Sequence, residues 1–180
     1  LISLLFPTVD RASLRAGVRA MGPITVAIGV WGIVTGVAIV NAGMPEVTAL
    51  VFSFTVFAGA AQLATLPLLA VGAPLPVVWV TAMLVNTRFV FFSATARRYF
   101  AHLPVAQRLV AGYLNGDLPF AMFLRHHGDD EAHGTPQQYG YFFGLTGVNW
   151  AVWHVASVVG ILLGGLAPAQ RRLDLAASLA

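Results

Sequence analysis

The chain has 180 residues, of which 58% are hydrophobic and only 9% are charged, whereas globular domains carry about 25% charged residues. So small a charged fraction cannot cover a surface of this size, which excludes a soluble globular domain and indicates an exterior surrounded by lipid. The net charge of +3 comes with ten arginines scattered between apolar blocks, a distribution that argues against nucleic-acid binding. The absence of cysteine excludes disulfides, thiol nucleophiles and cysteine-ligated metals.

Apolar blocks recur along the whole chain, and a helix that spans a bilayer needs about 20 predominantly apolar residues. The sequence therefore predicts an all-α fold, a polytopic transmembrane helical bundle that forms a single transmembrane domain over residues 1–180. The predicted blocks cover residues 21–40, 47–71, 75–96, 109–124 and 139–166, and another begins at residue 173.

The second block, residues 47–71, has small and polar residues at its centre. Gly59, Ala60 and Gln62 stand where a simple span would have leucine or valine, and Pro67 follows them. This pattern predicts a broken or re-entrant helix, with two arms of about 12 residues that each extend roughly 18 Å. The alternative is one long, tilted helix of about 25 residues, in which the small residues allow close helix packing.

The arginines in short loops indicate the topology, because positive residues are retained in the cytoplasm. If every block crosses once, the arginines divide almost evenly between the two sides. If residues 47–71 re-enter instead, eight arginines lie inside and only Arg125 lies outside, beside Asp129, Asp130 and Glu131. The sequence thus predicts a multi-pass protein with a cytoplasmic N-terminus and a single crossing by residues 109–124.

Three ionisable residues, Arg88, Asp117 and His154, lie inside apolar blocks. Each such residue costs at least about 2.5 kcal/mol in a membrane unless it has a partner, a water-filled cavity or a function. Arg88 either extends to the lipid headgroups or points into a cavity, where it pairs with Asp117 or receives a substrate carboxylate. His154 is either a hydrogen-bonded packing residue or part of a proton relay.

Asp117 stands two residues before a proline that predicts a kink or break in the helix at this acid. Pro119 lacks a backbone donor and clashes with the carbonyl group four residues earlier. A carboxylate beside freed backbone groups is a candidate proton or ammonium site. The alternative is a structural salt bridge between Asp117 and Arg88.

Sequence motifs of soluble enzymes do not occur in the chain. It has no nucleotide-binding Gly-Lys-Ser/Thr loop, no Gly-x-Ser-x-Gly elbow and no His-Glu-x-x-His zinc motif. We therefore predict no catalytic residues, no metal site and no cofactor. His126, His127 and His133 flank acidic residues, but their irregular spacing favours a solvated loop over a metal site.

Four segments of the chain together resemble one family of membrane proteins. They are FAGAAQLA (57–64), NTRFVFFSA (86–94), NGDLPFA (115–121) and GLTGVNWAVWHVASVVGILLGGLAP (144–168). These segments are similar to the AzlC family, the large subunit of branched-chain amino-acid exporters, also called the LIV-E family. The chain departs from the family pattern at Ala61, Phe89 and Leu118, where the family often has a serine, a histidine and an acid.

The resemblance implies secondary export of leucine, isoleucine, valine and methionine across the bacterial inner membrane. It also implies a partner, the small AzlD-type membrane subunit. Since family members continue through further helices, we expect the C-terminus of this chain to be truncated. Two other functions stay open: a non-transporting scaffold or regulatory subunit, and a carrier of a different small metabolite.

A zwitterionic amino acid needs groups for its carboxylate, its ammonium and its apolar tail. We expect backbone N–H groups at the start of a half-helix to bind the carboxylate, amide or acidic groups to bind the ammonium, and aromatic rings to receive the tail. Entry of a proton would couple export of the amino acid to the proton gradient across the membrane. The predicted substrate-binding residues are Phe57, Gly59, Ala60, Gln62, Asn86, Arg88 and Asn115, and the predicted proton-coupling residues are Asp117 and His154.

Overall fold

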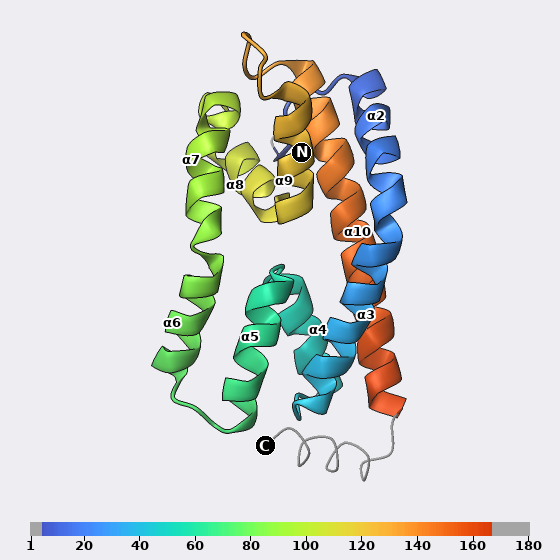
Figure 1. Ribbon diagram of the computed structural model, residues 1–180, viewed down its shortest axis with the longest axis vertical. Helices are drawn as coiled ribbons and strands as arrows, with labels where there is room; N and C mark the ends of the chain where they lie inside the picture. The colour runs from blue at the N-terminus through green and yellow to red at the C-terminus, as the bar shows by residue number, and fades with distance from the viewer. Residues whose placement is uncertain (1–4, 167–180) are drawn as a thin grey trace. The chain divides into compact units, whose positions relative to one another are not determined.

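The computed structural model describes residues 5–166, and every regular element in this range is helical (Figure 1). The elements are α2 (Arg11–Met21), η1 (Gly22–Ile24), α3 (Thr25–Asn41), α4 (Glu46–Thr55), α5 (Gly59–Ala70), α6 (Leu75–Asn86), α7 (Arg88–Phe100), α8 (Val105–Leu114), α9 (Asp117–His127) and α10 (Pro136–Leu166). The predicted all-α fold is confirmed. The block predicted to begin at residue 173 lies outside the described residues.

Some of these helices are long and apolar enough to cross a membrane. Within the described residues they are Arg11–Asn41, which joins α2, η1 and α3, and Pro136–Leu166, which is α10; each has 31 residues. Helices α6 and α7 pass the same test as a pair that is bent by 44°. Helices α4 and α5 are apolar but have only 10 and 12 residues. The predicted transmembrane helical bundle is confirmed.

The chain divides into two compact units. Within the described residues, unit 1 comprises residues 5–25 and 88–151, and unit 2 comprises residues 26–87 and 152–166. Helix α10 therefore contributes its first half to unit 1 and its second half to unit 2.

Glycines set the distance between α10 and its partner helix in each unit. In unit 1, a Cβ atom on Gly17 of α2 would collide with the carbonyl oxygen of Tyr141. In unit 2, a Cβ atom on Gly36 of α3 would collide with the carbonyl oxygen of Ser157. Backbones approach this closely because glycine has no side chain. Helix α10 is thus the surface on which α2 packs in unit 1 and α3 packs in unit 2.

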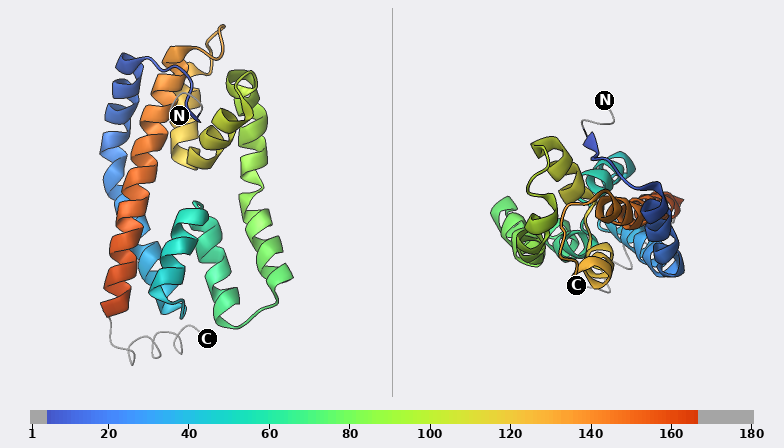
Figure 2. Two further views of the ribbon diagram at one scale, coloured as in Figure 1. Left: turned by 180° about the vertical axis from the view of Figure 1, so that it is seen from behind. Right: turned by 90° about the horizontal axis from the view of Figure 1, so that it is seen from above.

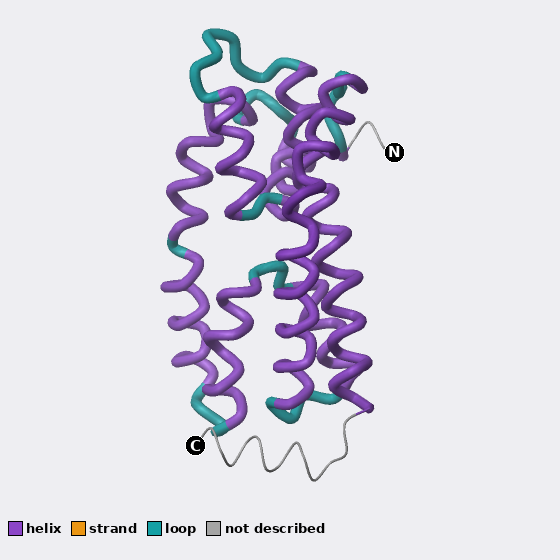
Figure 3. The backbone as a smooth tube through the Cα atoms, turned by 45° about the vertical axis from the view of Figure 1, so that its right-hand side comes forward, coloured by secondary structure: helices purple, strands orange, loops and turns teal. Residues whose placement is uncertain are grey.

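In unit 2, α4 and α5 form a hairpin, which the left view of Figure 2 shows from behind and Figure 3 shows with its turn as a loop between two helical arms. Helix α4 ends at Thr55 and α5 begins at Gly59, so residues 56–58 form the turn. Apolar side chains of both arms pack with α3 and α10. The core of this contact consists of Ile39, Val40, Ala49, Leu66 and Ile161. The broken helix predicted within residues 47–71 is confirmed, and the alternative of one long helix is wrong.

In unit 1, α8 and α9 form a second hairpin, which the sequence did not predict. Asn115 and Gly116 are extended, with ψ angles of 143° and 167°, so the chain leaves the helical conformation between α8 and α9. The Tyr99 hydroxyl near the end of α7 donates a hydrogen bond to the His127 carbonyl oxygen at the end of α9 (2.9 Å). The chain therefore enters α8 and leaves α9 at the same end of unit 1.

This second hairpin corrects the predicted topology. The sequence predicted one crossing by residues 109–124, which would separate Arg125 from Arg97 and Arg108. In the structure, the Arg98 guanidinium at the end of α7 donates to the carbonyl oxygen of the α9 C-cap (3.3 Å). Arg125 thus lies at the same end of unit 1 as Arg97 and Arg108, and the predicted single crossing is wrong. Composition does not reveal the hairpin, because an apolar block that turns back has the same hydropathy as one that crosses the membrane.

Candidate functional site

An ion pair between two helix starts is the clearest polar feature of unit 1. Arg88 Nε lies 2.8 Å from Asp117 Oδ1, and the two side chains are 34% and 51% exposed. Arg88 begins α7 and Asp117 begins α9. The positive end of the α9 dipole favours the Asp117 carboxylate, whereas the positive end of the α7 dipole disfavours the Arg88 guanidinium. Asp117 therefore supplies the stabilisation that α7 does not give to Arg88. Of the interpretations of Arg88, the structure supports the pairing with Asp117.

The start of α9 leaves backbone donors without intrahelical partners. Its N-cap, Gly116, has no side chain to cap the helix, and the Phe120 N–H donates to the Gly116 carbonyl oxygen (3.0 Å). Pro119 lies in this first turn, where backbone N–H groups have no acceptor within the helix, so the missing N–H of proline costs no hydrogen bond. The predicted break at the acid is confirmed, because the helix is interrupted at residues 115–116, where Asn115 carries the carbonyl group four residues before Pro119, and Asp117 begins the new helix. The uncapped start is suited to an anion or a water molecule.

Two asparagine amides flank this break. The Asn115 Oδ1 atom is buried and accepts no hydrogen bond within the described residues. A Cβ atom on Gly116 would lie 3.2 Å from the Nδ2 atom of Asn149, which comes from α10. Asn149 is missing from the predicted site residues, although a polar residue inside the apolar block 139–166 was a visible signal.

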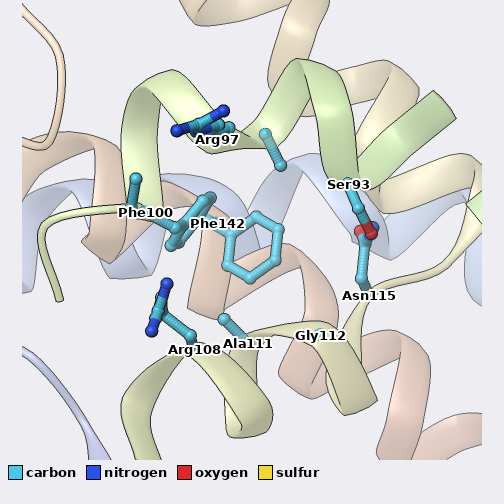
Figure 4. Close-up of a pocket in the computed structure, with 10 residues that line it drawn as sticks. Ser93, Arg97, Phe100, Arg108, Ala111, Gly112, Asn115 and Phe142 are labelled. Carbon is cyan, nitrogen blue, oxygen red and sulfur yellow. The ribbon is translucent and has the colours of Figure 1, made fainter. Parts of the chain in front are cut away.

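A cavity of about 490 Å³ opens in unit 1 among α7, α8 and α10 (Figure 4). It is lined by Ser93, Ala96, Arg97, Phe100, Ala101, Arg108, Ala111, Gly112, Asn115 and Phe142. Asn115 is a predicted site residue, whereas Arg97 and Arg108 were assigned to a polar connector and used for orientation alone. The short connector of residues 101–104 holds the two arginine-bearing helix ends together.

In unit 2, aromatic rings surround the turn of the α4–α5 hairpin. His154 is only 3% exposed, and its ring centroid lies 4.5 Å from that of Phe54 and 5.2 Å from that of Phe57. The Trp153 ring lies against the start of α5, where a Cβ atom on Gly59 would collide with it. Gly59 is therefore required by close packing, and His154 has the surroundings of a packing residue.

Gln62 is the most deeply buried polar residue of the predicted site. Its side chain is 0% exposed, and neither amide atom has a hydrogen-bond partner within the described residues. It lies in the first turn of α5, whose N-cap, Ala58, offers no side-chain cap. A buried amide without partners costs about 1–3 kcal/mol. The start of α5, with the half-buried Gly59 and Ala60, thus combines free backbone donors with an unpaired polar side chain.

Asn86 is the last residue of α6, which packs against α5 in unit 2. Its Oδ1 atom is buried and has no hydrogen-bond partner within the described residues. The predicted site residues therefore fall into two groups, one in each unit. Unit 1 holds Arg88, Asn115 and Asp117, and unit 2 holds Phe57, Gly59, Ala60, Gln62, Asn86 and His154.

Comparison with known proteins gives one match. Residues 23–167, well over half of the chain, match the family model described as AzlC protein. No curated protein and no solved structure matches the chain. Together with the apolar helices of spanning length, the match identifies a membrane protein related to transport.

Proposed function

The chain belongs to the AzlC family, and from this membership we propose that it is a secondary transporter that exports leucine, isoleucine, valine and methionine. It works in the bacterial inner membrane with its N-terminus in the cytoplasm. It is the large subunit of a two-component exporter, and the second component is a small AzlD-type membrane protein.

The observation that carries this proposal is the Arg88–Asp117 ion pair. Charged groups are rare and expensive among apolar helices, and in membrane proteins they mark the paths of substrates and protons. Asp117 is half exposed and begins an uncapped half-helix, which is a recurring position for ion and substrate sites in transporters. Protonation of Asp117 would remove its charge and release Arg88, so one proton can change the state of this centre.

Each unit offers groups for an amino acid. In unit 2, the start of α5 and Gln62 can donate hydrogen bonds to a carboxylate, the Asn86 oxygen can accept one from an ammonium, and Phe57 offers an apolar surface. In unit 1, Arg88 can pair with a carboxylate once Asp117 is protonated, and the Asn115 oxygen can accept from an ammonium. We assign proton coupling to Asp117, with His154 as a second candidate.

Export of radiolabelled leucine from proteoliposomes under an imposed pH gradient tests the proposal. We expect Asp117→Asn to remove the response to the gradient, because the amide cannot take up or release the proton. Asp129→Asn serves as the matched control, since it removes an exposed carboxylate from the connector between α9 and α10. Gradient-driven leucine export by Asp117→Asn at the wild-type rate would contradict the proposed coupling.

The same vesicles separate transport from a scaffolding role. Counterflow of leucine by the purified chain, measured with and without the small subunit, is expected to require both subunits. A panel of other small metabolites in the same assay tests the substrate. Absence of counterflow with every substrate, in the presence of the small subunit, would favour the non-transporting scaffold.

A further inference from the structure

The cavity of unit 1 presents two arginines to one space. Arg97 comes from the last turn of α7 and Arg108 from the first half of α8, and Figure 4 shows them above and below the rings of Phe100 and Phe142. Among residues 5–166, the ion pairs that the structure contains involve neither of these guanidinium groups. Two guanidinium groups that line one cavity make the electrostatic potential in it positive. The cavity is therefore suited to an anionic group.

The remaining lining restricts the kind of anion. Phe100 and Phe142 form an apolar wall, and the other lining residues near them are alanines and a glycine. Figure 4 shows Ser93 and Asn115 together on the side opposite the arginines. A planar guanidinium fork matches the oxygens of a phosphate group, which it can bind through two parallel hydrogen bonds. The lining thus fits a phosphate that is attached to a larger molecule with apolar parts.

The position of the two arginines indicates the source of that phosphate. Arg97 lies at the end of the α6–α7 pair that is a candidate span, and a short connector leads to α8. Next to Arg108 on α8, Val105 is 61% exposed and Leu109 is 69% exposed, which gives acyl chains an apolar surface. Phosphate groups of lipids and basic residues meet at such helix ends.

We propose that this cavity binds the headgroup of an acidic phospholipid, with Arg97 and Arg108 as the ligands of its phosphate. Ser93 then faces the polar part of the headgroup beyond the phosphate. The proposal goes beyond amino-acid export, because neither arginine belongs to the proposed transport residues. A lipid bound here would hold the end of α7 to the start of α8.

Native mass spectrometry of the full chain in detergent, titrated with phosphatidylglycerol, tests the proposal. We expect Arg97→Gln with Arg108→Gln to weaken phosphatidylglycerol binding about tenfold for each guanidinium removed. The matched control, Arg11→Gln with Arg15→Gln, removes two exposed arginines of α2 in the same unit and should bind like wild type. The variant Arg97→Lys with Arg108→Lys keeps both charges and should show an intermediate loss.

Competition experiments distinguish the sources of the anion. Zwitterionic phosphatidylethanolamine should bind more weakly than phosphatidylglycerol, and neither millimolar inorganic phosphate nor leucine should displace the lipid. Equal phosphatidylglycerol binding by wild type and the glutamine pair would overturn the proposal, as would an equal loss in the α2 control. Displacement by inorganic phosphate would assign the cavity to free phosphate, and displacement by leucine would assign it to the transported amino acid. Thermal unfolding of each variant, compared with wild type, identifies a loss that comes from misfolding.

Discussion

At the residue scale, Gln62 is a residue that lowers the stability of the fold and is proposed to bind the substrate. Its amide is fully buried at the start of α5 and has no hydrogen-bond partner within the described residues. Leucine or methionine would fill this place without an unpaired polar group. The composition of the block 47–71 made Gln62 a predicted site residue, but its burial without a partner could not be predicted, because it depends on which helices cover it.

Replacing the Gln62 amide with an apolar side chain should therefore raise stability and lower transport. We expect Gln62→Leu to increase the free energy of unfolding by about 1 kcal/mol or more, because an unpaired buried amide is removed. Leucine export in proteoliposomes should fall at the same time. Thr65→Val is the control, since the Thr65 hydroxyl donates to the Ala61 carbonyl oxygen (2.9 Å) and lies outside the proposed site. A Gln62→Leu protein that exports leucine normally would remove this amide from the site.

A second residue, Asp130, makes one end of unit 1 sensitive to acid. Hydrogen bonds from the Gln138 side chain (2.9 Å) and then from His127 (2.7 Å) hold the pKa of the Asp130 carboxyl below its ordinary value. A lowered pKa stabilises the folded state above the ordinary carboxyl pKa of about 3.9, and this stabilisation is lost as the pH falls through the lowered value. The connector of residues 128–135 should thus open in acid.

Hydrogen exchange or limited proteolysis of the connector checks this pH dependence. We expect wild type to become progressively more susceptible as the pH falls from the ordinary carboxyl pKa of about 3.9 through the lowered pKa of Asp130. Asp130→Asn should be more susceptible at neutral pH and should lose this part of the pH dependence. Asp129→Asn, which changes the neighbouring exposed acid, should behave like wild type. A wild-type connector that is equally protected on both sides of pH 4 would contradict the expectation.

At the element scale, the two hairpins differ in how far the sequence predicts them. The α4–α5 hairpin was predicted because Gly59, Ala60 and Gln62 stand out in an apolar block. The α8–α9 hairpin was missed because Asn115 and Gly116 were interpreted as part of a kink in a crossing helix. The sequence marks both breaks, but the direction in which the chain continues depends on tertiary contacts such as the Tyr99–His127 hydrogen bond.

Labelling of single cysteines tests both hairpins, because the native chain contains no cysteine. We expect Leu103→Cys and Asp129→Cys to react with a membrane-impermeant thiol reagent from the same side, since they flank the α8–α9 hairpin. Met44→Cys and Ala73→Cys, which flank the α4–α5 hairpin, should likewise share one side. Reaction of the two members of a pair from opposite sides would show that the stretch between them crosses the membrane.

At the scale of the whole molecule, composition predicted the class of protein and the family motifs predicted the transport relation. The low charge and the apolar blocks require a membrane protein, and the helices Arg11–Asn41 and Pro136–Leu166 have the length for it. The grouping of the site residues could not be predicted in this way, because α10 is one helix in sequence but belongs to both units. The cavity, and the position of Arg97 and Arg108 in its lining, could not be inferred either. Counting the loop arginines on each side of the membrane indicates orientation alone.

The shared use of α10 also has a consequence for how the protein is made. The glycine contacts show that α2 in unit 1 and α3 in unit 2 both pack on this helix, which is the last one in the described range. The first long helix leaves the ribosome early, but its packing partner follows only after residues 42–135 have been synthesised. Both hairpins are therefore synthesised before the helix on which the bundle packs. Contacts between segments that lie far apart in the sequence form slowly. Insertion of α10 is then the step that gives both α2 and α3 their packing partner.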